Sequence, residues 1–236
     1  MASFAGPNLI NDSLMLSLDA ANTNSYPGSG TTWIDMSDKG NDGTLVNGAA
    51  FDSGNNGVIN LDGSNDRIDV AYSPTLAFSN GIITLEIWLY VDSLTTGFPL
   101  ICKRGNGATN NDRPYNFEIN SGGYVRWILT DDGSGLTVCD TDVLIVAGNW
   151  YHIVGTHDNS NAKVYINGVE VKSVSSSITA LETTNNNTLT RIGFRHTNTG
   201  SIYGDGKVAV ARAYSKTLTA SEVSQNYMAL KGRFGL

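Results

Sequence analysis

One segment near the middle of the chain limits the fold more than any other, because it predicts three consecutive β-strands. β-Branched and aromatic residues dominate Trp150–His157, a polar turn over 158–161 follows, and Lys163–Ile166 forms the second strand. Asn167-Gly168 separates this strand from Val169–Ser173. Asn and Gly both adopt the positive φ of a type I′ turn, whose twist matches that of paired strands. We therefore expect a meander of strands that contains a two-residue hairpin.

The longest regular alternation lies between Ile82 and Val91. One face of this strand is aliphatic, and we expect it to form the core between two sheets. The other face carries two aromatic residues and a carboxylate, so it either lines a groove or is covered by loops and a third small sheet. The aliphatic face consists of Ile83, Leu85, Ile87, Leu89 and Val91, and the other face of Thr84, Glu86, Trp88, Tyr90 and Asp92.

The composition supports many strands joined by many turns in one domain. Of the 236 residues, 40% are apolar, only 16% are charged and 26 are glycine. The net charge is −7, and no clustered Lys and Arg occur along the sequence. This disfavours nucleic acid as a partner, because phosphate neutralisation needs clustered cations.

No targeting or membrane segment is expected. Residues 1–14 lack a basic region followed by an apolar run, so they are not a secretion signal, and no apolar run approaches the ~20 residues of a membrane span. The two cysteines, Cys102 and Cys139, are either reduced thiols in or near strands or partners in a disulfide.

A change of pattern near the C-terminus predicts one short helix. Thr219-Ala-Ser-Glu222 is a capping box, and apolar residues at helical spacing follow it. Gly232 is expected to end the helix, which we place at about 220–231. The expected organisation is an N-terminal extension over 1–13, a β-sandwich over 14–218 and a C-terminal helix and tail over 219–236.

Several motifs are similar to those of laminin-G-like domains. The pattern W-x-H-x-V-x-T-x-D begins at Trp150, V-Y-I-N-G begins at Val164, and W-x-D-x-S-x-x-G-N-x-G-T-L begins at Trp33. The resemblance places the chain in the concanavalin A-like lectin/glucanase superfamily. It implies an all-β fold, an antiparallel β-sandwich of jelly-roll type. Trp33 is expected either to plug the end of the sandwich or to contact a ligand.

This superfamily includes glucanases, but the sequence argues against an enzyme. Retaining glycosidases need two carboxyl groups about 5–5.5 Å apart, and laminarinase-type enzymes place them in an E-x-D-x-x-E run. No such run occurs here, because Trp88 and Tyr90 follow Glu86 where further carboxylates are required. There is also no G-x-S-x-G elbow, and His152 belongs to the family's strand pattern.

The resemblance leaves calcium open and implies no other cofactor. Many relatives hold Ca²⁺ through oxygen ligands, and Asp62, Asn65 and Asp66 supply such oxygens in one turn. However, Ala209 stands where the last strand of the family often has an aspartate.

A glycan-binding surface is the remaining candidate site. Such sites combine aromatic rings with amides, carboxylates or arginines, although most aromatic residues of a sandwich belong to its core. A polar stretch over 104–116 is longer than a normal hairpin connection, and such loops often carry function. The candidate ligand contacts are Trp88, Tyr90, Arg104, Arg113, Tyr115, Tyr124, Trp127 and Asp131.

The C-terminal sequence from Leu218 to Leu236 is similar to the ends of laminin-G-like virion proteins of tailed bacteriophages. The resemblance implies a non-enzymatic virion structural protein, in capsid decoration, a fibre or a tail appendage, assembled in the host cytoplasm. Its expected partners are other virion proteins, further copies of itself and glycans. The alternatives are a stand-alone lectin and, third, a glycoside hydrolase.

The apolar residues near both ends suggest a docking role. One or both ends are expected to dock on a neighbouring subunit or on the virion particle, and the alternative is that they are disordered or pack on the chain itself. The residues concerned are Phe4, Leu9, Ile10, Phe234 and Leu236.

Overall fold

The computed structural model describes residues 7–105, 113–131, 135–181 and 188–236. Phe4 and the middle of the polar stretch 104–116 lie outside these ranges. Within them, no helix is long and apolar enough to cross a membrane.

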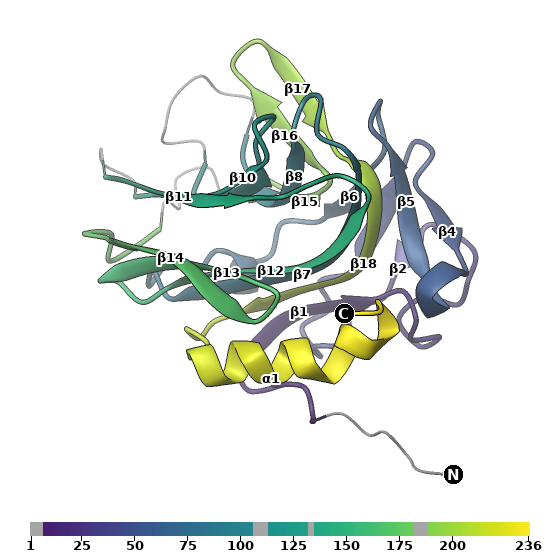
Figure 1. The fold of residues 1–236 in the computed structure, drawn as a ribbon, viewed down its shortest axis with the longest axis horizontal. Coiled ribbons are helices and arrows are strands. Elements are labelled where there is room, and N and C mark those ends of the chain that lie inside the picture. Colours follow the sequence, from purple (N-terminus) through teal and green to yellow (C-terminus); the bar gives the residue numbers. More distant parts are fainter. Residues whose placement is uncertain (1–6, 106–112, 132–134, 182–187) are drawn as a thin grey trace.

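Two sheets, here called sheet A and sheet B, pack face to face (Figure 1). Every strand pairing in the described ranges is antiparallel, which confirms the predicted β-sandwich. Sheet A has the order β14 (Val169–Ser175), β13 (Asn161–Ile166), β12 (Asn149–His157), β7 (Ile83–Ser93), β18 (Asp205–Tyr214), β5 (Val58–Asp62) and β4 (Ala50–Asp52), and β1 (Leu14–Asp19) also pairs with β18.

Sheet B carries a small hairpin on its outer side. Its order is β11 (Leu136–Leu144), β10 (Tyr124–Thr130), β9 (Tyr115–Ile119), β8 (Phe98–Lys103), β15 (Thr190–Ile192), β6 (Arg67–Val70), β3 (Gly43–Val46) and β2 (Thr32–Trp33). The hairpin consists of β16 (Phe194–Thr197) and β17 (Gly200–Tyr203), and both of its strands contact β8 (Figure 1). Short 3₁₀ helices are η1 (Gly54–Asn56), η2 (Pro74–Leu76) and η4 (Lys231–Arg233).

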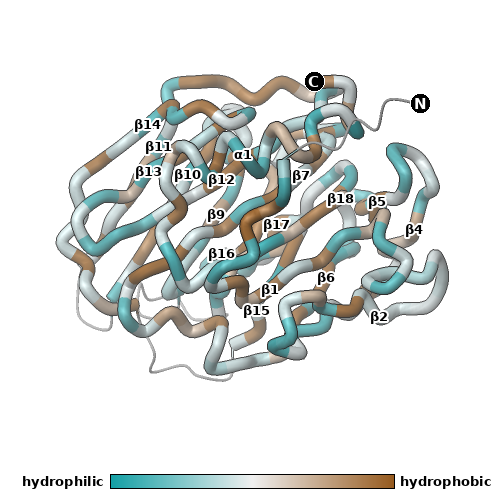
Figure 2. Tube along the Cα trace, turned by 90° about the horizontal axis from the view of Figure 1, so that it is seen from below, coloured by the Kyte–Doolittle hydropathy of each residue, from teal (hydrophilic) through white to brown (hydrophobic). Residues whose placement is uncertain are grey.

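The core lies between the two sheets. The aliphatic face of β7 is fully buried there, as its alternation predicted. Along the strands, hydrophobic and hydrophilic residues alternate in colour (Figure 2), as expected when one face of a strand enters the core. Trp33 is fully buried in the same core, so it is not a ligand contact. Cys102 and Cys139 are buried free thiols, and burial raises the pKa of each to about 12.

The C-terminal helix α1 (Ala220–Leu230) covers the outer face of sheet A (Figure 1). The predicted capping box forms, since the Thr219 hydroxyl accepts from the Glu222 amide while Glu222 accepts from the Thr219 amide. The helix ends at Leu230 with Lys231 as its C-cap, within one residue of the predicted end at 231. Gly232 follows at the predicted C′ position but lacks the positive φ of a left-handed stop, which occurs at Gly235 after η4. We expected the mixed face of β7 either to line a groove or to be covered by loops and a third small sheet. Where this face is covered, at Trp88, the cover consists of α1 and the tail.

A fully buried polar network joins sheet A to α1. Glu86 on β7 accepts hydrogen bonds from Arg212 at 2.9 Å, from Asn226 of α1 at 2.7 Å and from Tyr214 at 3.2 Å. His152 lies 3.2 Å from the same carboxylate. Burial alone raises the pKa of Glu86, but the Arg212 charge and the hydrogen bonds outweigh it and hold that pKa at about 2.

Described residues of both terminal segments pack on their own fold, as the self-packing alternative expects for Ile10 and Phe234, while docking on a neighbouring subunit stays a prediction. Phe234 is only 6% exposed and stacks on Trp88 with ring centroids 4.5 Å apart. Arg233 fixes the tail by an ion pair with Asp19 at 2.8 Å. At the other end, Ile10 packs in an apolar cluster under α1. Leu236 remains 40% exposed, and Phe4 lies outside the described residues.

The predicted hairpin turn forms and also supports α1. Asn167 and Gly168 have φ values of 51° and 79°, as a type I′ turn requires. A Cβ atom added to Gly168 would lie 2.9–3.1 Å from the Tyr227 side chain of α1. The glycine is therefore needed both for its backbone conformation and for close packing of the helix.

Replacing Gly168 by Ala should destabilise the protein by about 1–3 kcal/mol, because alanine is strained at positive φ and its methyl group meets Tyr227. Urea denaturation measures this loss. Gly232→Ala is the matched control, since nothing lies within 4 Å of its added Cβ and its φ is not positive, and it should be neutral or slightly stabilising. Equal effects of the two changes would contradict this account.

Glu86→Gln should cost about 3–5 kcal/mol of unfolding free energy, because it leaves the buried Arg212 without its counter-charge. The control is Glu170→Gln, which removes a 37% exposed carboxylate paired with Lys163 and should cost less than about 1 kcal/mol. Urea denaturation of both variants at neutral pH makes the comparison.

The pH dependence of the Glu86→Gln effect is a second readout. Because folding lowers the pKa of Glu86 from 4.5 to about 2, its contribution is fully present above pH 4.5 and is lost as the pH falls towards 2. The stability difference between wild type and Glu86→Gln should therefore shrink across this window. A difference that stays constant there would show that the carboxylate is not held ionised by the network.

Candidate functional site

The structure divides the predicted ligand contacts into buried and accessible residues. Trp88, Tyr115 and Trp127 are each 0% exposed. Tyr115 and Trp127 belong to the core between the sheets, and Trp88 lies under Phe234 and α1. The expected ligand contacts through these three rings are therefore wrong. Their alternation placed them on strands correctly, but it did not show which face of each strand is covered.

Tyr90 lies in a pocket on the outer face of sheet A. Strand register places Trp150 of β12 and Lys207 of β18 on either side of it, in one cross-strand row. The rings of Tyr90 and Trp150 are tilted by 59° with centroids 5.6 Å apart, and both are half-buried. Asn55 and Asp92 complete a cavity of about 200 Å³, here called the Tyr90 pocket.

Neighbouring parts of the chain hold the walls of this pocket. Trp150 packs against Phe234 of the tail with centroids 4.5 Å apart. The carbonyl group of Asn55 accepts a hydrogen bond from Arg233 at 2.6 Å, and the Asn55 amide donates to the Arg233 carbonyl group at 3.1 Å. In the described part of the protein, Asp92 forms no ion pair and the Tyr90 hydroxyl forms no hydrogen bond. The Lys207 ammonium group is ion-paired with Asp52 at 3.4 Å. The pocket thus offers two fixed rings beside the Asp92 carboxylate and the Tyr90 hydroxyl group.

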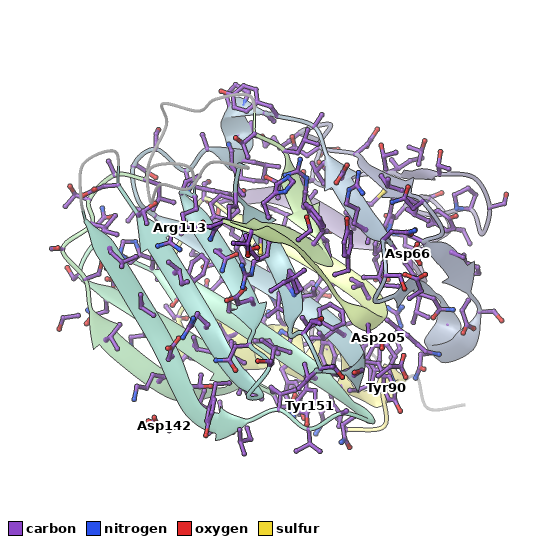
Figure 3. The ribbon with its side chains drawn as sticks, turned by 90° about the horizontal axis from the view of Figure 1, so that it is seen from above. Asp66, Tyr90, Arg113, Asp142, Tyr151 and Asp205 are labelled. Carbon is purple, nitrogen blue, oxygen red and sulfur yellow. The ribbon has the colours of Figure 1, made fainter. Side chains whose placement is uncertain are left out.

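Arg104 and Arg113 lie elsewhere, on the outer face of sheet B. Figure 3 looks onto this face and shows Arg113 beside the hairpin β16–β17, well separated from Tyr90. Arg126 of β10 and Arg195 of β16 join them there, and Arg195 forms an ion pair with Glu118 of β9. We call Arg104, Arg113, Arg126 and Arg195 the arginine cluster. The sequence contains no run of basic residues, so only the fold brings these four together.

Tyr124 is 38% exposed and lines a second cavity on this outer face, of about 410 Å³. Arg126 and Asp140 form part of its wall and are joined by two hydrogen bonds, at 2.9 and 3.0 Å. Asp131 follows β10, and its carboxylate accepts from the Gly135 amide at 2.7 Å. The predicted residues thus do not form one site: Tyr90 lies on sheet A, and the others that are accessible lie on sheet B.

The predicted calcium ligands are engaged in a turn. Asp66 is 4% exposed and accepts from the backbone amides of Gly48 and Asp62, at 2.7 and 3.1 Å. The Asp62 side chain in turn accepts from the Ser64 amide at 2.8 Å. Such bonds are those that shape an Asx turn, and they explain these residue types without a metal. Among the described residues, no group of three or more His, Cys, Asp or Glu side chains is arranged to hold a metal ion.

The described contacts of Glu86 include no second carboxylate of the kind that glycosidase chemistry uses. All its hydrogen bonds in the described ranges go to Arg212, His152, Tyr214 and Asn226, and its side chain is fully buried. His152 is equally buried, so its role is structural, as the strand pattern suggested.

Sequence reasoning missed Trp150, Lys207, Arg126 and Arg195. The first two join Tyr90 only through strand register, which the local pattern does not reveal. Arg126 lies two residues after the predicted contact Tyr124 on β10. Because side chains two residues apart point to the same face of a strand, the sequence could have indicated Arg126 as a candidate contact as well.

A family described as the concanavalin A-like lectin/glucanases superfamily, of laminin G type, matches residues 62–224. The chain belongs to this superfamily. The match includes most of sheet A, much of sheet B and the start of α1. No curated protein matches the sequence.

Several solved structures share the fold of this superfamily member at low sequence identity. The binding domain of Paraclostridial Mosquitocidal Protein 1 superposes with a TM-score of 0.70 and 18% identity over 92% of this chain. The binding domain of botulinum neurotoxin DC in complex with SialylT gives 0.70 and 15% over 93%. This chain spans 52% of each of those chains, about half their length.

A third structure is matched over nearly its whole length. Domain 4 of AbnA, a GH43 extracellular arabinanase from Geobacillus stearothermophilus, solved in complex with arabinotriose, has a TM-score of 0.67 and 20% identity. The alignment covers 91% of this chain and 98% of that domain. At these identities the likeness establishes the shared fold.

Proposed function

We propose that this protein is a non-catalytic carbohydrate-binding domain that holds a saccharide unit in the Tyr90 pocket. The observation that carries the proposal is the pair of fixed, half-exposed rings, Tyr90 and Trp150, beside the polar groups of Asn55, Asp92 and Lys207. A sugar ring presents an apolar face that packs on aromatic rings and a rim of hydroxyl groups that needs donors and acceptors. The pocket supplies both kinds of partner.

The size of the pocket suits a single unit of a glycan. Its volume of about 200 Å³ is below the roughly 300–1,000 Å³ of sites that enclose a drug-sized ligand. Support also comes from the fold, since the AbnA domain with the same architecture was solved with arabinotriose. We infer binding without hydrolysis, because Glu86 is buried and Glu118 and Asp140 are both engaged by arginines.

Tyr90→Ala should lower the affinity for the neutral oligosaccharide that binds best on a glycan array by about tenfold, because it removes one ring and one hydroxyl group from the pocket. Isothermal titration calorimetry measures the loss. Tyr124→Ala is the matched control, an exposed tyrosine on sheet B, and should bind like wild type. If Tyr124→Ala loses affinity and Tyr90→Ala does not, the Tyr90 pocket is not the site.

Release of reducing sugar by the wild type would overturn the non-catalytic assignment.

We further propose that this domain acts in the virion of a tailed bacteriophage, in capsid decoration, a fibre or a tail appendage. The specific support is the similarity of the sequence from Leu218 to Leu236 to the ends of virion proteins. In this chain that sequence forms α1 and the tail that cover sheet A, so it is a part of the fold rather than a free extension.

The virion assignment predicts that the protein copurifies with phage particles at a fixed copy number per particle. Quantitative mass spectrometry of particles purified on a density gradient measures that ratio. A protein that stays at the top of the gradient, or whose ratio varies between preparations, would argue for a stand-alone lectin.

A further inference from the structure

Three carboxylates lie at one end of three adjacent strands of sheet A, where the Tyr90 pocket opens. Asp92 of β7 lines the pocket and lies on the same strand face as Tyr90. Asp205 of β18 pairs in register with Ser93 of β7 on one side and with Asp62 of β5 on the other. Strand pairing therefore brings together three acidic residues that are far apart in the sequence.

The negative charges of these carboxylates are not compensated within the described part of the chain. None of the three forms an ion pair there, and Lys207, which also lines the pocket, is already paired with Asp52. Burial raises the pKa of Asp205, and the charges of Asp92 and Asp62 raise it further. Because like charges held this close destabilise one another, a cation bound beside them would be stabilised.

The hydrogen-bonding groups at this end of sheet A include several acceptors without a donor. In the described ranges, the side chains of Asp92 and Asp205 accept no hydrogen bond. Asn60, which pairs in register with Lys207, has a buried side-chain oxygen that also lacks a hydrogen-bond partner among the described residues. A protonated amino group offers three donors and no acceptor, so it suits such surroundings better than a hydroxyl group does.

The two rings of the pocket favour the same kind of ligand. The face of an aromatic ring attracts a cation within about 6 Å of its centroid, and the attraction strengthens where water is excluded. Tyr90 and Trp150 are half-buried with their centroids 5.6 Å apart, so both rings are available to one bound group. A metal ion fits less well, because no group of three or more His, Cys, Asp or Glu side chains among the described residues is arranged to hold one.

We propose that the saccharide unit in the Tyr90 pocket carries a protonated amino group, which pairs with Asp92 against the rings of Tyr90 and Trp150. This inference rests on the proposed function and names the class of its ligand, an oligosaccharide with free amines. The sugar ring and its hydroxyl groups contact the pocket as those of a neutral sugar do, and the amino group adds to that contact. Asp205 strengthens it at longer range through its charge.

The probes are the trimer of glucosamine and its fully N-acetylated counterpart, which keeps the same sugar rings but has no charge. Each is titrated by calorimetry at about pH 6, where the carboxylates are ionised and the amines hold their protons. Wild type should bind the glucosamine trimer about tenfold or more tightly than the acetylated trimer, and this preference should shrink as NaCl rises from about 0.05 to 0.3 M. Equal affinities would overturn the inference. Equally tight binding of trilysine would overturn it too, since the surface would then hold any polyamine.

The decisive variant is Asp92→Asn, which should weaken binding of the glucosamine trimer by about tenfold and leave binding of the acetylated trimer unchanged. Asp92 is exposed and has no described bond to lose, so the melting temperature should stay the same. Equal weakening of both trimers would instead indicate a structural role and overturn the inference. The matched control is Asp142→Asn, which removes the same charge from a side chain that is 81% exposed on sheet B, well separated from Tyr90 (Figure 3), and it should bind like wild type.

The outcomes separate this inference from the proposed function. If Tyr90→Ala weakens binding of both trimers and Asp92→Asn of neither, the pocket is the saccharide site but the amino-group inference is wrong. If Tyr90→Ala weakens binding of neither, both proposals are wrong. If neither trimer binds to the wild type, the amino-group inference is wrong, and Tyr90→Ala tested with the neutral oligosaccharide still decides the proposed function.

Discussion

The buried carboxylate of Glu86 determines how the C-terminal helix sits on the sandwich. It lies on β7 and joins Arg212 of β18 and Asn226 of α1, so one side chain connects two strands and the helix. Asn226 in turn accepts a hydrogen bond from the Ile10 amide at 2.9 Å, which adds the N-terminal segment to the network. A buried charge of this kind tolerates few arrangements, because each displaced partner leaves an uncompensated group. An apolar contact alone would permit the helix to slide along the sheet.

The position of α1 decides what the outer face of sheet A can do. The helix and tail cover Trp88 completely but leave Tyr90, two residues further along β7, half-exposed. The same alternating face of one strand therefore provides a core residue at one point and a pocket wall at the next. On the other sheet, no helix of the described ranges covers the outer face, and the hairpin β16–β17 brings Arg195 to Glu118.

Features determined by local sequence were predicted well. The positive φ values of Asn167 and Gly168, the capping box at Thr219 and the aliphatic face of β7 each depend on residues close together in the chain. The site was predicted poorly because it depends on distant segments. Trp88 is covered by Phe234, which lies far away in the sequence. The arginine cluster likewise combines residues from four separate segments of the chain. The packing of Ile10 and Phe234 beside α1 could not be read from the sequence for the same reason, because their partners lie far away in the chain.

The contact between Trp150 and Phe234 places the tail directly against a residue that lines the Tyr90 pocket. A ligand that packs on one side of this indole ring and the tail that packs on the other both restrict the same side chain. By thermodynamic linkage, whatever tightens the tail favours the ligand-ready orientation of Trp150, and a bound ligand tightens the tail by the same free energy. On the proposal that the Tyr90 pocket binds a saccharide, a partner at the C-terminus that alters the packing of Phe234 would therefore change saccharide affinity without touching the saccharide itself.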